Sequence, residues 1–422
     1  MLQTAPLPLP ATLHFPIRRL VGILVESAGL VLLPRQIGAR EHKSSAGEDF
    51  AAGMELLIEA WTLAAMARMA VPNDLWRFAH ALFHSASNEQ RSARLIQAYK
   101  RLLLGAAVQA EALSAREIVW VGDFLADHAD LVDLISLAES VSGGFWVDPA
   151  QDMAPVAVLR RPPPAVDGLL HLTTGVLVKR ISERIEWLEA IPGGALSDSP
   201  EDGPAMADEA DLPLGLSRRE LHGLLLRLRE FWSMPPQRDQ PRRSKHYEVE
   251  VCVGLKAIWD VLQRGEQRAP VQRCSVFNES PGGVAILSAG PVGEGVEAGM
   301  AVALRANPGE VWTLCIVRWI RGDRLSHLEL GLQVVAEGPV PIRLGFRGTD
   351  WGELVHALLL RPMGAVRRNQ AVLAPAGSCL SRRFIFVQEG KGLYVAQGRL
   401  LSLDMQTTGV ELFQFEVDPY PI

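Results

Sequence analysis

The feature that most constrains the fold is a change in hydrophobic periodicity after Pro235 and Pro236. Before this point apolar residues recur every three or four positions, as at Met54, Leu57 and Ile58, which is the period of amphipathic helices. After it they alternate with polar or small residues at the period of a strand, as at Tyr247, Val249, Val251 and Val253. The order of the two patterns predicts an α+β multidomain protein with an α-helical N-terminal domain, an antiparallel β-barrel and a further C-terminal β unit.

Helix breakers and changes in composition divide the chain into five parts. About four helices are expected in the N-terminal part, and one of them starts at a capping box of Ser114 and Glu117. No clear internal repeat is present. The expected parts are an α-helical domain at residues 1–145, Pro-rich and acidic linkers flanking a helix at 146–216, a connecting helix at 217–236, the β-barrel at 237–340 and a C-terminal β-rich domain at 341–422.

The composition excludes several classes of protein. The 422 residues are 48% hydrophobic and 21% charged, as in ordinary globular domains, and the formal net charge of −6 lacks the basic character of proteins that bind nucleic acid polymers. The four cysteines form no CxxC pair, so neither a disulfide framework nor a zinc site is indicated. The apolar residues 20–33 fall short of the roughly 20 that a membrane span needs. We therefore expect a buried segment there, no membrane span and a cytoplasmic protein.

Two short polar segments lie near the first strands of the predicted β-barrel. The first is the basic cluster of Arg238, Arg242 and Arg243 just before the first strand. The second lies between the next two strands and has the sequence Asn-Glu-Ser-Pro-Gly-Gly, with Asn278, Ser280, Gly282 and Gly283 as its candidate ligand-binding residues.

This pair resembles the RxxxR and [D/N]xSxxG motifs of the PilZ family, bacterial modules that bind the second messenger cyclic di-GMP. Arg238 and Arg242 match the first motif, and Asn278, Ser280 and Gly283 match the second. Strands at Val317-Arg318-Trp319 and Leu330-Gly331-Leu332 also resemble later strands of PilZ barrels. The resemblance covers about a quarter of the chain and implies a cyclic di-GMP ligand. We expect no catalytic residue, metal or other cofactor.

The chemistry of the ligand explains the residue types. Cyclic di-GMP has two phosphates and two guanines, and a guanidinium fork matches both a phosphate and the O6 and N7 acceptors of guanine. Asn278 can donate and accept hydrogen bonds, Ser280 can bond a base or backbone, and glycine allows close approach of chain and ligand. Taken separately, the arginines would be a solvated linker and the glycine-rich segment a turn.

Other candidate sites are weaker. His80 and His84 have the i,i+4 spacing of metal ligands, but Phe78, Leu82 and Phe83 beside them indicate a packed helical face. No GxSxG, P-loop or GxGxxG motif stands between a strand and a helix, so no catalytic site is predicted. Residues 254–268 form an insertion within the barrel, expected to be a helix or loop that packs on it or lies near the ligand.

The sequence therefore predicts a bacterial cyclic di-GMP effector rather than an enzyme. Ligand binding would change the interdomain geometry. The resemblance implies that this change regulates motility, polysaccharide synthesis or biofilm formation, through a protein partner that we expect the helical N-terminal domain to bind. The alternative is a ligand-independent interaction or scaffold protein with a degenerate PilZ barrel. An enzyme with an unrecognised N-terminal site is a third possibility.

Overall fold

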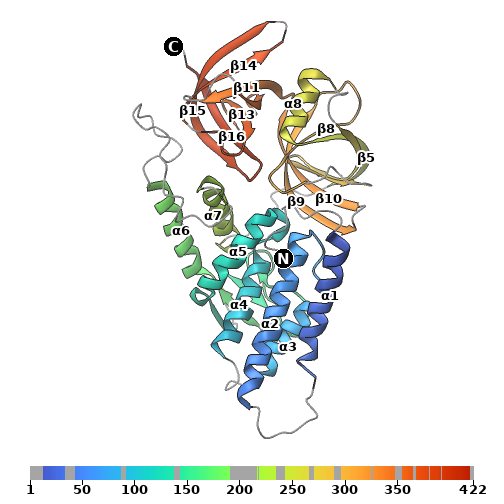
Figure 1. The fold of residues 1–422 in the computed structure, drawn as a ribbon, viewed down its shortest axis with the longest axis vertical. Helices are drawn as coiled ribbons and strands as arrows, with labels where there is room; N and C mark the ends of the chain where they lie inside the picture. The colour runs from blue at the N-terminus through green and yellow to red at the C-terminus, as the bar shows by residue number, and fades with distance from the viewer. Residues whose placement is uncertain are drawn as a thin grey trace. The chain divides into compact units, whose positions relative to one another are not determined.

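The computed structural model forms two compact units, Met1–Ile185 with Leu225–Arg238 and Glu186–Leu224 with Asp239–Ile422. Each unit is described by itself (Figure 1). The described residues are 13–33, 43–86, 92–136, 143–190, 216, 218–233, 243–265, 270–288, 296–324, 327–346, 354–364, 367–379, 381–390 and 392–418.

Five α-helices build most of the first unit: α1 (His14–Leu30), α2 (Lys43–Met66), α3 (Leu75–Ser85), α4 (Ala93–Ala107) and α5 (Ala115–His128). The predicted capping box is confirmed at the start of α5, where Ser114 Oγ accepts from the Glu117 N–H at 3.3 Å and the Glu117 carboxylate accepts from the Ser114 N–H at 2.8 Å. The prediction of a buried segment at residues 20–33 was wrong in part, because α1 buries Val21 and Val25 but exposes Leu30. No helix in the described residues is long and apolar enough to cross a membrane.

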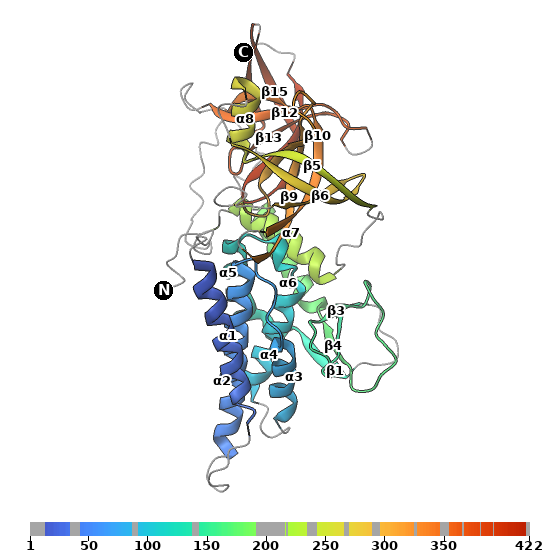
Figure 2. The same cartoon turned by 90° about the vertical axis from the view of Figure 1, so that its right-hand side faces the viewer.

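A small sheet lies beside these helices (Figure 2). It has the strand order β1-β4-β2-β3 and is formed by β1 (Asp133–Ser136), β2 (Phe145–Val147), β3 (Val156–Ala157) and β4 (Leu170–Thr173). Buried His80 connects the helices to the segment before β3, since its Nδ1 lies 2.7 Å from the Tyr99 hydroxyl and its Nε2 lies 3.2 Å from the Met153 carbonyl. The described residues of the expected linker region thus contain strands, together with helix α6 (Gly175–Ala190).

The C-terminal half of α7 (Arg218–Ser233) is anchored to the first unit. Trp232 is fully buried, its indole Nε1–H donates to the Leu104 carbonyl at 3.3 Å, and its carbonyl accepts from the Thr174 hydroxyl at 2.6 Å. Arg227 forms an ion pair with the buried carboxylate of Glu117. These contacts fix the last helical segment before the arginine cluster.

Six antiparallel strands close the first barrel in the order β10-β7-β6-β5-β8-β9. Alternate side chains such as Val249, Val251, Ile286 and Leu330 fill its interior. The strands are β5 (Arg243–Val253), β6 (Val271–Ser280), β7 (Gly283–Ser288), β8 (Ala301–Arg305), β9 (Thr313–Arg324) and β10 (His327–Glu337).

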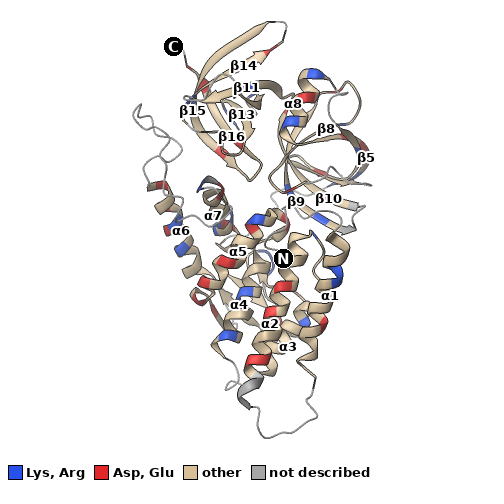
Figure 3. Cartoon of the chain, in the orientation of Figure 1, with Lys and Arg blue, Asp and Glu red and all other residues tan. Residues whose placement is uncertain are grey.

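The insertion between β5 and β6 forms helix α8 (Leu255–Arg264). Gly254 precedes it with φ 95°, a backbone conformation that favours glycine. Figure 3 shows an acidic turn between two basic turns of α8, which corresponds to Asp260 bonded to Lys256 at 2.7 Å and to Arg264 at 3.3 Å. On its other face the Trp259 indole N–H donates to the Ile342 carbonyl at 2.8 Å. The helix therefore packs against the strand that opens the next domain.

A second closed barrel follows in the order β11-β12-β13-β16-β15-β14. Counted from its own first strand, its pairings are 1-2, 2-3, 3-6, 6-5, 5-4 and 4-1, the same as those of the first barrel. The fold is therefore repeated although no repeat is visible in the sequence. The strands are β11 (Val340–Phe346), β12 (Val355–Leu360), β13 (Gln370–Pro375), β14 (Arg383–Glu389), β15 (Leu393–Gln406) and β16 (Val410–Val417).

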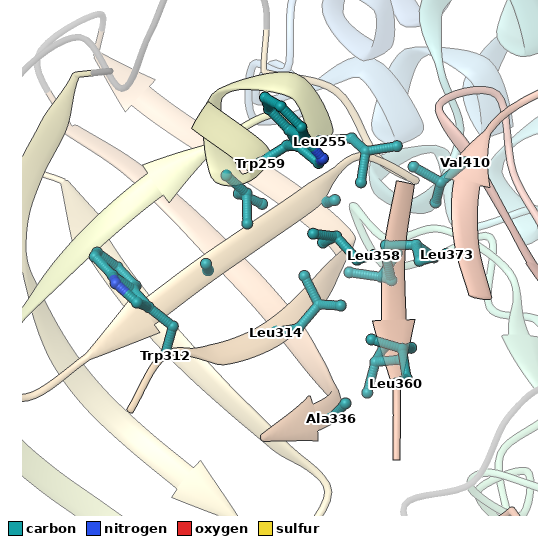
Figure 4. Close-up of a cluster of buried hydrophobic side chains, with 14 of the residues drawn as sticks. Leu255, Trp259, Trp312, Leu314, Ala336, Leu358, Leu360, Leu373 and Val410 are labelled. Carbon is teal, nitrogen blue, oxygen red and sulfur yellow. The ribbon is translucent and has the colours of Figure 1, made fainter. Parts of the chain in front are cut away.

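The two barrels share a buried apolar cluster (Figure 4). The outer face of β8 and β9 contributes Ala301, Ala303, Leu314 and Ile316 from the first barrel. The second barrel contributes fully buried side chains of β12 and β13, and α8 covers one end of the cluster. Thr407 of the second barrel also donates its hydroxyl to the Gly299 carbonyl at 2.7 Å. This continuous core joins the barrels into one unit.

Candidate ligand-binding site

The polar segment between β6 and β7 forms a tight hairpin, here called the signature hairpin (residues 278–283). Ser280 pairs with Gly283 at its end, and the Ser280 hydroxyl donates to the Gly283 carbonyl at 3.3 Å. A Cβ at Gly282 would meet nothing within 4 Å. A Cβ at Gly283 would lie 2.6 Å from the Leu332 carbonyl oxygen of β10, so only glycine allows this approach of two strands. The hairpin is thus exposed at Gly282 and packed at Gly283.

Asn278 holds an unpaired buried atom beside this hairpin. It lies opposite Ser244 on β5 and Ala285 on β7. Its Oδ1 is inaccessible to solvent and has no hydrogen-bond partner among the described residues. Leaving a buried acceptor unpaired costs about 1–3 kcal/mol, and such atoms are rare in native structures. The side chain is therefore poised to accept a hydrogen bond that these residues do not supply.

Charged and aromatic side chains hold the start of β5 to the end of β6. Arg243 is the first residue of β5, and it lies opposite Glu279. The Glu279 carboxylate accepts from the Tyr247 hydroxyl at 2.9 Å and pairs with the Lys245 ammonium at 3.2 Å. The hydrogen bond from Tyr247 is the largest cause that lowers the pKa of Glu279, and Lys245 lowers it further. Burial is the largest cause that raises the pKa of Tyr247 to about 12, and the Glu279 carboxylate adds to this rise. These contacts place the chain entering β5 next to Asn278.

A row of side chains runs from Asn278 across the outside of the barrel. Direct register partners in antiparallel strands lie on the same face. Asn278 on β6 pairs with Ala285 on β7, Ala285 with Gly331 on β10, and Gly331 with Trp319 on β9. Ile286, the next residue of β7, belongs to the barrel interior, so the Asn278 row faces outward.

Trp319 lies over the glycine in this row. A Cβ on Gly331 would be 1.9 Å from the Trp319 indole Nε1, so the ring occupies the space that any other residue would fill. The Arg321 guanidinium lies 5.2 Å from the centre of the same ring. Two strand spacings, roughly 10 Å, separate Asn278 from the position of Gly331. The two middle residues of the row are covered, since Ala285 is 1% exposed and Gly331 is buried, so the row has a polar group at one end and an aromatic ring at the other.

Comparison with known proteins identifies the domain that carries this site. Residues 260–341 match the family model described as "Cyclic-di-GMP receptor FimW, middle PilZ domain". The first barrel belongs to the PilZ family. The matched residues of the PilZ domain contain the signature hairpin and Trp319 but not the arginine cluster. Residues 18–139 match a second model, "Cyclic-di-GMP receptor FimW, N-terminal domain".

A characterised relative agrees with these matches. The cyclic-di-GMP receptor FimW of Pseudomonas aeruginosa is 32% identical over 108 residues, which is 25% of this chain and 18% of the relative. The match thus spans less than a fifth of the relative's length.

The structure brings most of the predicted site residues together on the PilZ domain. Arg243, Asn278, Ser280, Gly282 and Gly283 lie on β5, β6, β7 and the turn between the last two. Their role in ligand binding stays a prediction. Arg238 and Arg242 lie outside the described residues.

Trp319 was not among the predicted site residues, because sequence reasoning placed it only in a typical PilZ strand. Its outward position opposite Gly331 makes it a candidate for the site, and this position depends on the register of β9 and β10. Among the described residues, no group of three or more His, Cys, Asp or Glu side chains is placed to hold a metal ion.

The corresponding face of the second barrel has a different chemistry. The strands equivalent to β6, β7, β10 and β9 are β12, β13, β16 and β15. Across them, Leu358 pairs with Leu373, Leu373 with Leu412, and Leu412 with Met405. These four side chains, here called the Leu358 row, all pack in the cluster shared with the PilZ domain. The face of the second barrel that corresponds to the Asn278 face of the PilZ domain is therefore apolar and covered.

Proposed function

We propose that the PilZ domain binds cyclic di-GMP on the outer face of β6, β7 and β10, with the segment containing Arg238, Arg242 and Arg243 closing over the ligand. The observation that carries this proposal is the buried, unpaired Oδ1 of Asn278 beside the start of β5. A guanine edge supplies N–H donors for such an acceptor. The relative's description as a cyclic-di-GMP receptor supports the same ligand.

The remaining groups of the face suit the other parts of the ligand. The Trp319 ring offers a surface on which a guanine can stack, a contact worth about 1–3 kcal/mol. Arginine guanidinium groups pair with phosphate and with guanine O6 and N7 through charge-assisted hydrogen bonds. The open side of Gly282 leaves space for the ligand backbone. The chain acts in this proposal as a binding protein and not as an enzyme.

Ligand binding is proposed to change the geometry between the two units. The division between them falls after Arg238, so one motif arginine belongs to the first unit and Arg242 to the second. Before this segment the chain is fixed by the contacts of Trp232 and Arg227 in α7. After it the chain is fixed by the β-ladder of β5 and β6, in which Arg243 lies opposite Glu279. A ligand held by both arginines would therefore restrain the connection.

The output of this change is proposed from the family resemblance. We infer a cytoplasmic effector whose helical N-terminal region binds a protein partner that regulates motility, polysaccharide synthesis or biofilm formation. The match of residues 18–139 to the FimW N-terminal model supports a helical region that belongs with this kind of receptor.

Isothermal titration of the full chain with cyclic di-GMP tests the proposal. We expect micromolar or tighter binding, no binding of GTP, and at least about 100-fold weaker binding by an Arg238→Ala, Arg242→Ala variant, because two charge-assisted contacts are lost. A variant that binds as tightly as the parent excludes the role of the arginines. A parent chain that binds nothing leaves the PilZ domain as an architectural element of an interaction protein.

A further inference from the structure

The hairpin between β12 and β13 carries a buried arginine at its tip. Arg367 is 3% exposed, and its backbone forms a bridge with Met363, with N–H to carbonyl distances of 2.8 and 3.3 Å. This hairpin joins strands two and three of the second barrel, as the signature hairpin does in the PilZ domain. The two barrels thus carry structurally equivalent hairpins with different residues.

Arg367 connects its own hairpin to the PilZ domain. Its Nη2 donates to the Arg361 carbonyl at 2.8 Å, and its Nη1 lies 3.4 Å from the Val335 carbonyl of β10, a long charge-assisted contact. Its Nε has no acceptor among the described residues. A buried guanidinium with an unpaired N–H is costly, and burial also lowers the pKa of Arg367. Packing alone would favour an apolar side chain at this position.

The contacted strand end also supports the signature hairpin. Val334, the neighbour of Val335, donates its N–H to the Gly282 carbonyl at 3.0 Å. Gln333, one residue earlier, is the register partner of Gly283. The Val334 N–H and the Val335 carbonyl belong to the two peptide groups on either side of the Val334–Val335 peptide, so a two-residue segment of β10 lies between Arg367 and the exposed turn. The path from the second barrel to the turn contains two hydrogen bonds.

We propose that Arg367 is a positioning residue for the signature hairpin, through which the second barrel sets the affinity of the dinucleotide site. The guanidinium fixes the end of β10, and the Val334 N–H in turn fixes the Gly282 carbonyl and the turn beside Ser280. This inference rests on the proposed function for its ligand, whereas the support of the hairpin is independent of any ligand.

The test compares three variants of the full chain. Arg367→Met keeps the side-chain volume and removes the donors. Arg368→Met changes the exposed neighbour, and Leu373→Ala weakens the same interface without removing the contact to Val335. The readouts are the hydrogen exchange of the ligand-free peptide at residues 331–336, the Kd for cyclic di-GMP and the thermal midpoint.

For Arg367→Met we expect about five- to tenfold faster exchange in that peptide and a similarly weaker Kd, which is less than the loss of an ideal charge-assisted hydrogen bond would give because the contact to Val335 is long at 3.4 Å. Arg368→Met should match the parent, and Leu373→Ala should lower the thermal midpoint while keeping the Kd. The inference is overturned if Arg367→Met behaves as Arg368→Met does, or if Leu373→Ala weakens binding equally. If the parent binds no dinucleotide, the proposed function fails and the exchange rate alone decides whether Arg367 positions the hairpin.

Discussion

In the PilZ domain the outer row across β6, β7, β10 and β9 reads Asn278, Ala285, Gly331 and Trp319. In the second barrel the row at the equivalent strands reads Leu358, Leu373, Leu412 and Met405. The first row is polar at one end and aromatic at the other. The second row is aliphatic and lies in the core between the barrels.

The difference shows how one strand order can serve two purposes. Closure of the barrel fixes which residues face outward, and the residue types on that face decide whether it binds a small ligand or packs against a neighbour. Asn278 leaves an acceptor unpaired, which costs stability but suits a ligand, whereas Leu358 and Leu373 are fully buried and stabilise the unit. Four substitutions test this contrast, in order of decreasing expected effect.

The largest effect is expected from Leu358→Ala in the second barrel. Leu358 is fully buried in the shared cluster, and truncating such a leucine typically costs about 2–5 kcal/mol. Chemical denaturation should show this loss in the free energy of unfolding. Leu393→Ala is the matched control, since Leu393 is 71% exposed on the same barrel and should change stability by less than about 0.5 kcal/mol. Equal effects of both changes would contradict a packed Leu358 row.

Asn278→Ala should weaken cyclic di-GMP binding about 10- to 100-fold, because the ligand loses a buried hydrogen bond. The free energy of unfolding should stay the same or rise, since no described residue pairs with Oδ1 in the free protein. Titration and denaturation measure the two quantities. Asn369→Ala on the β12–β13 hairpin is the control and should leave the Kd unchanged. Unchanged binding by Asn278→Ala would remove this side chain from the site.

Gly283→Ala should destabilise the PilZ domain by about 1–3 kcal/mol, because the new methyl group meets the Leu332 carbonyl at 2.6 Å. Gly282→Ala, one residue earlier, places its methyl group in open space and should have a smaller effect on stability. Thermal unfolding distinguishes the two variants. If both were tolerated equally, the close approach of β7 and β10 would be in doubt.

The smallest effect concerns the pH dependence of the Glu279 contacts. The pKa of Glu279 is lowered in the folded chain, so its contribution is complete above the unfolded value of about 4.5 and is lost as the pH falls through the lower folded value. Glu279→Gln should therefore lower the thermal midpoint at pH 7 and lose that difference near pH 3. Glu416→Gln, at an exposed position of β16, is the matched control. A difference that persists at pH 3 would rule out the carboxylate as its cause.

Much of this architecture could be predicted from local patterns. The change of periodicity separated helices from strands, the Ser114 and Glu117 spacing identified the start of α5, and the insertion after Gly254 is helix α8. The glycine-rich segment was placed between two strands, and the family resemblance of the domain is confirmed.

Other features depend on contacts between residues far apart in the sequence. The repetition of the barrel was not visible in the sequence. Two barrels with the same strand order need not share a sequence pattern when equivalent outward positions hold residues as different as Asn278 and Leu358. The outer position of Trp319 depends on the register of β9 with β10, which contains bulges. The contact of Arg367 with Val335 joins two barrels and has no local signal.

Ultraviolet crosslinking of cyclic di-GMP to the full chain, with the linked peptides mapped by mass spectrometry, locates the ligand on the protein. We expect crosslinks within residues 238–288 and at the peptide containing Trp319, and competition by unlabelled cyclic di-GMP. Competed crosslinks confined to residues 341–422 would contradict this expectation, because the second barrel would then hold the ligand and the PilZ domain would not.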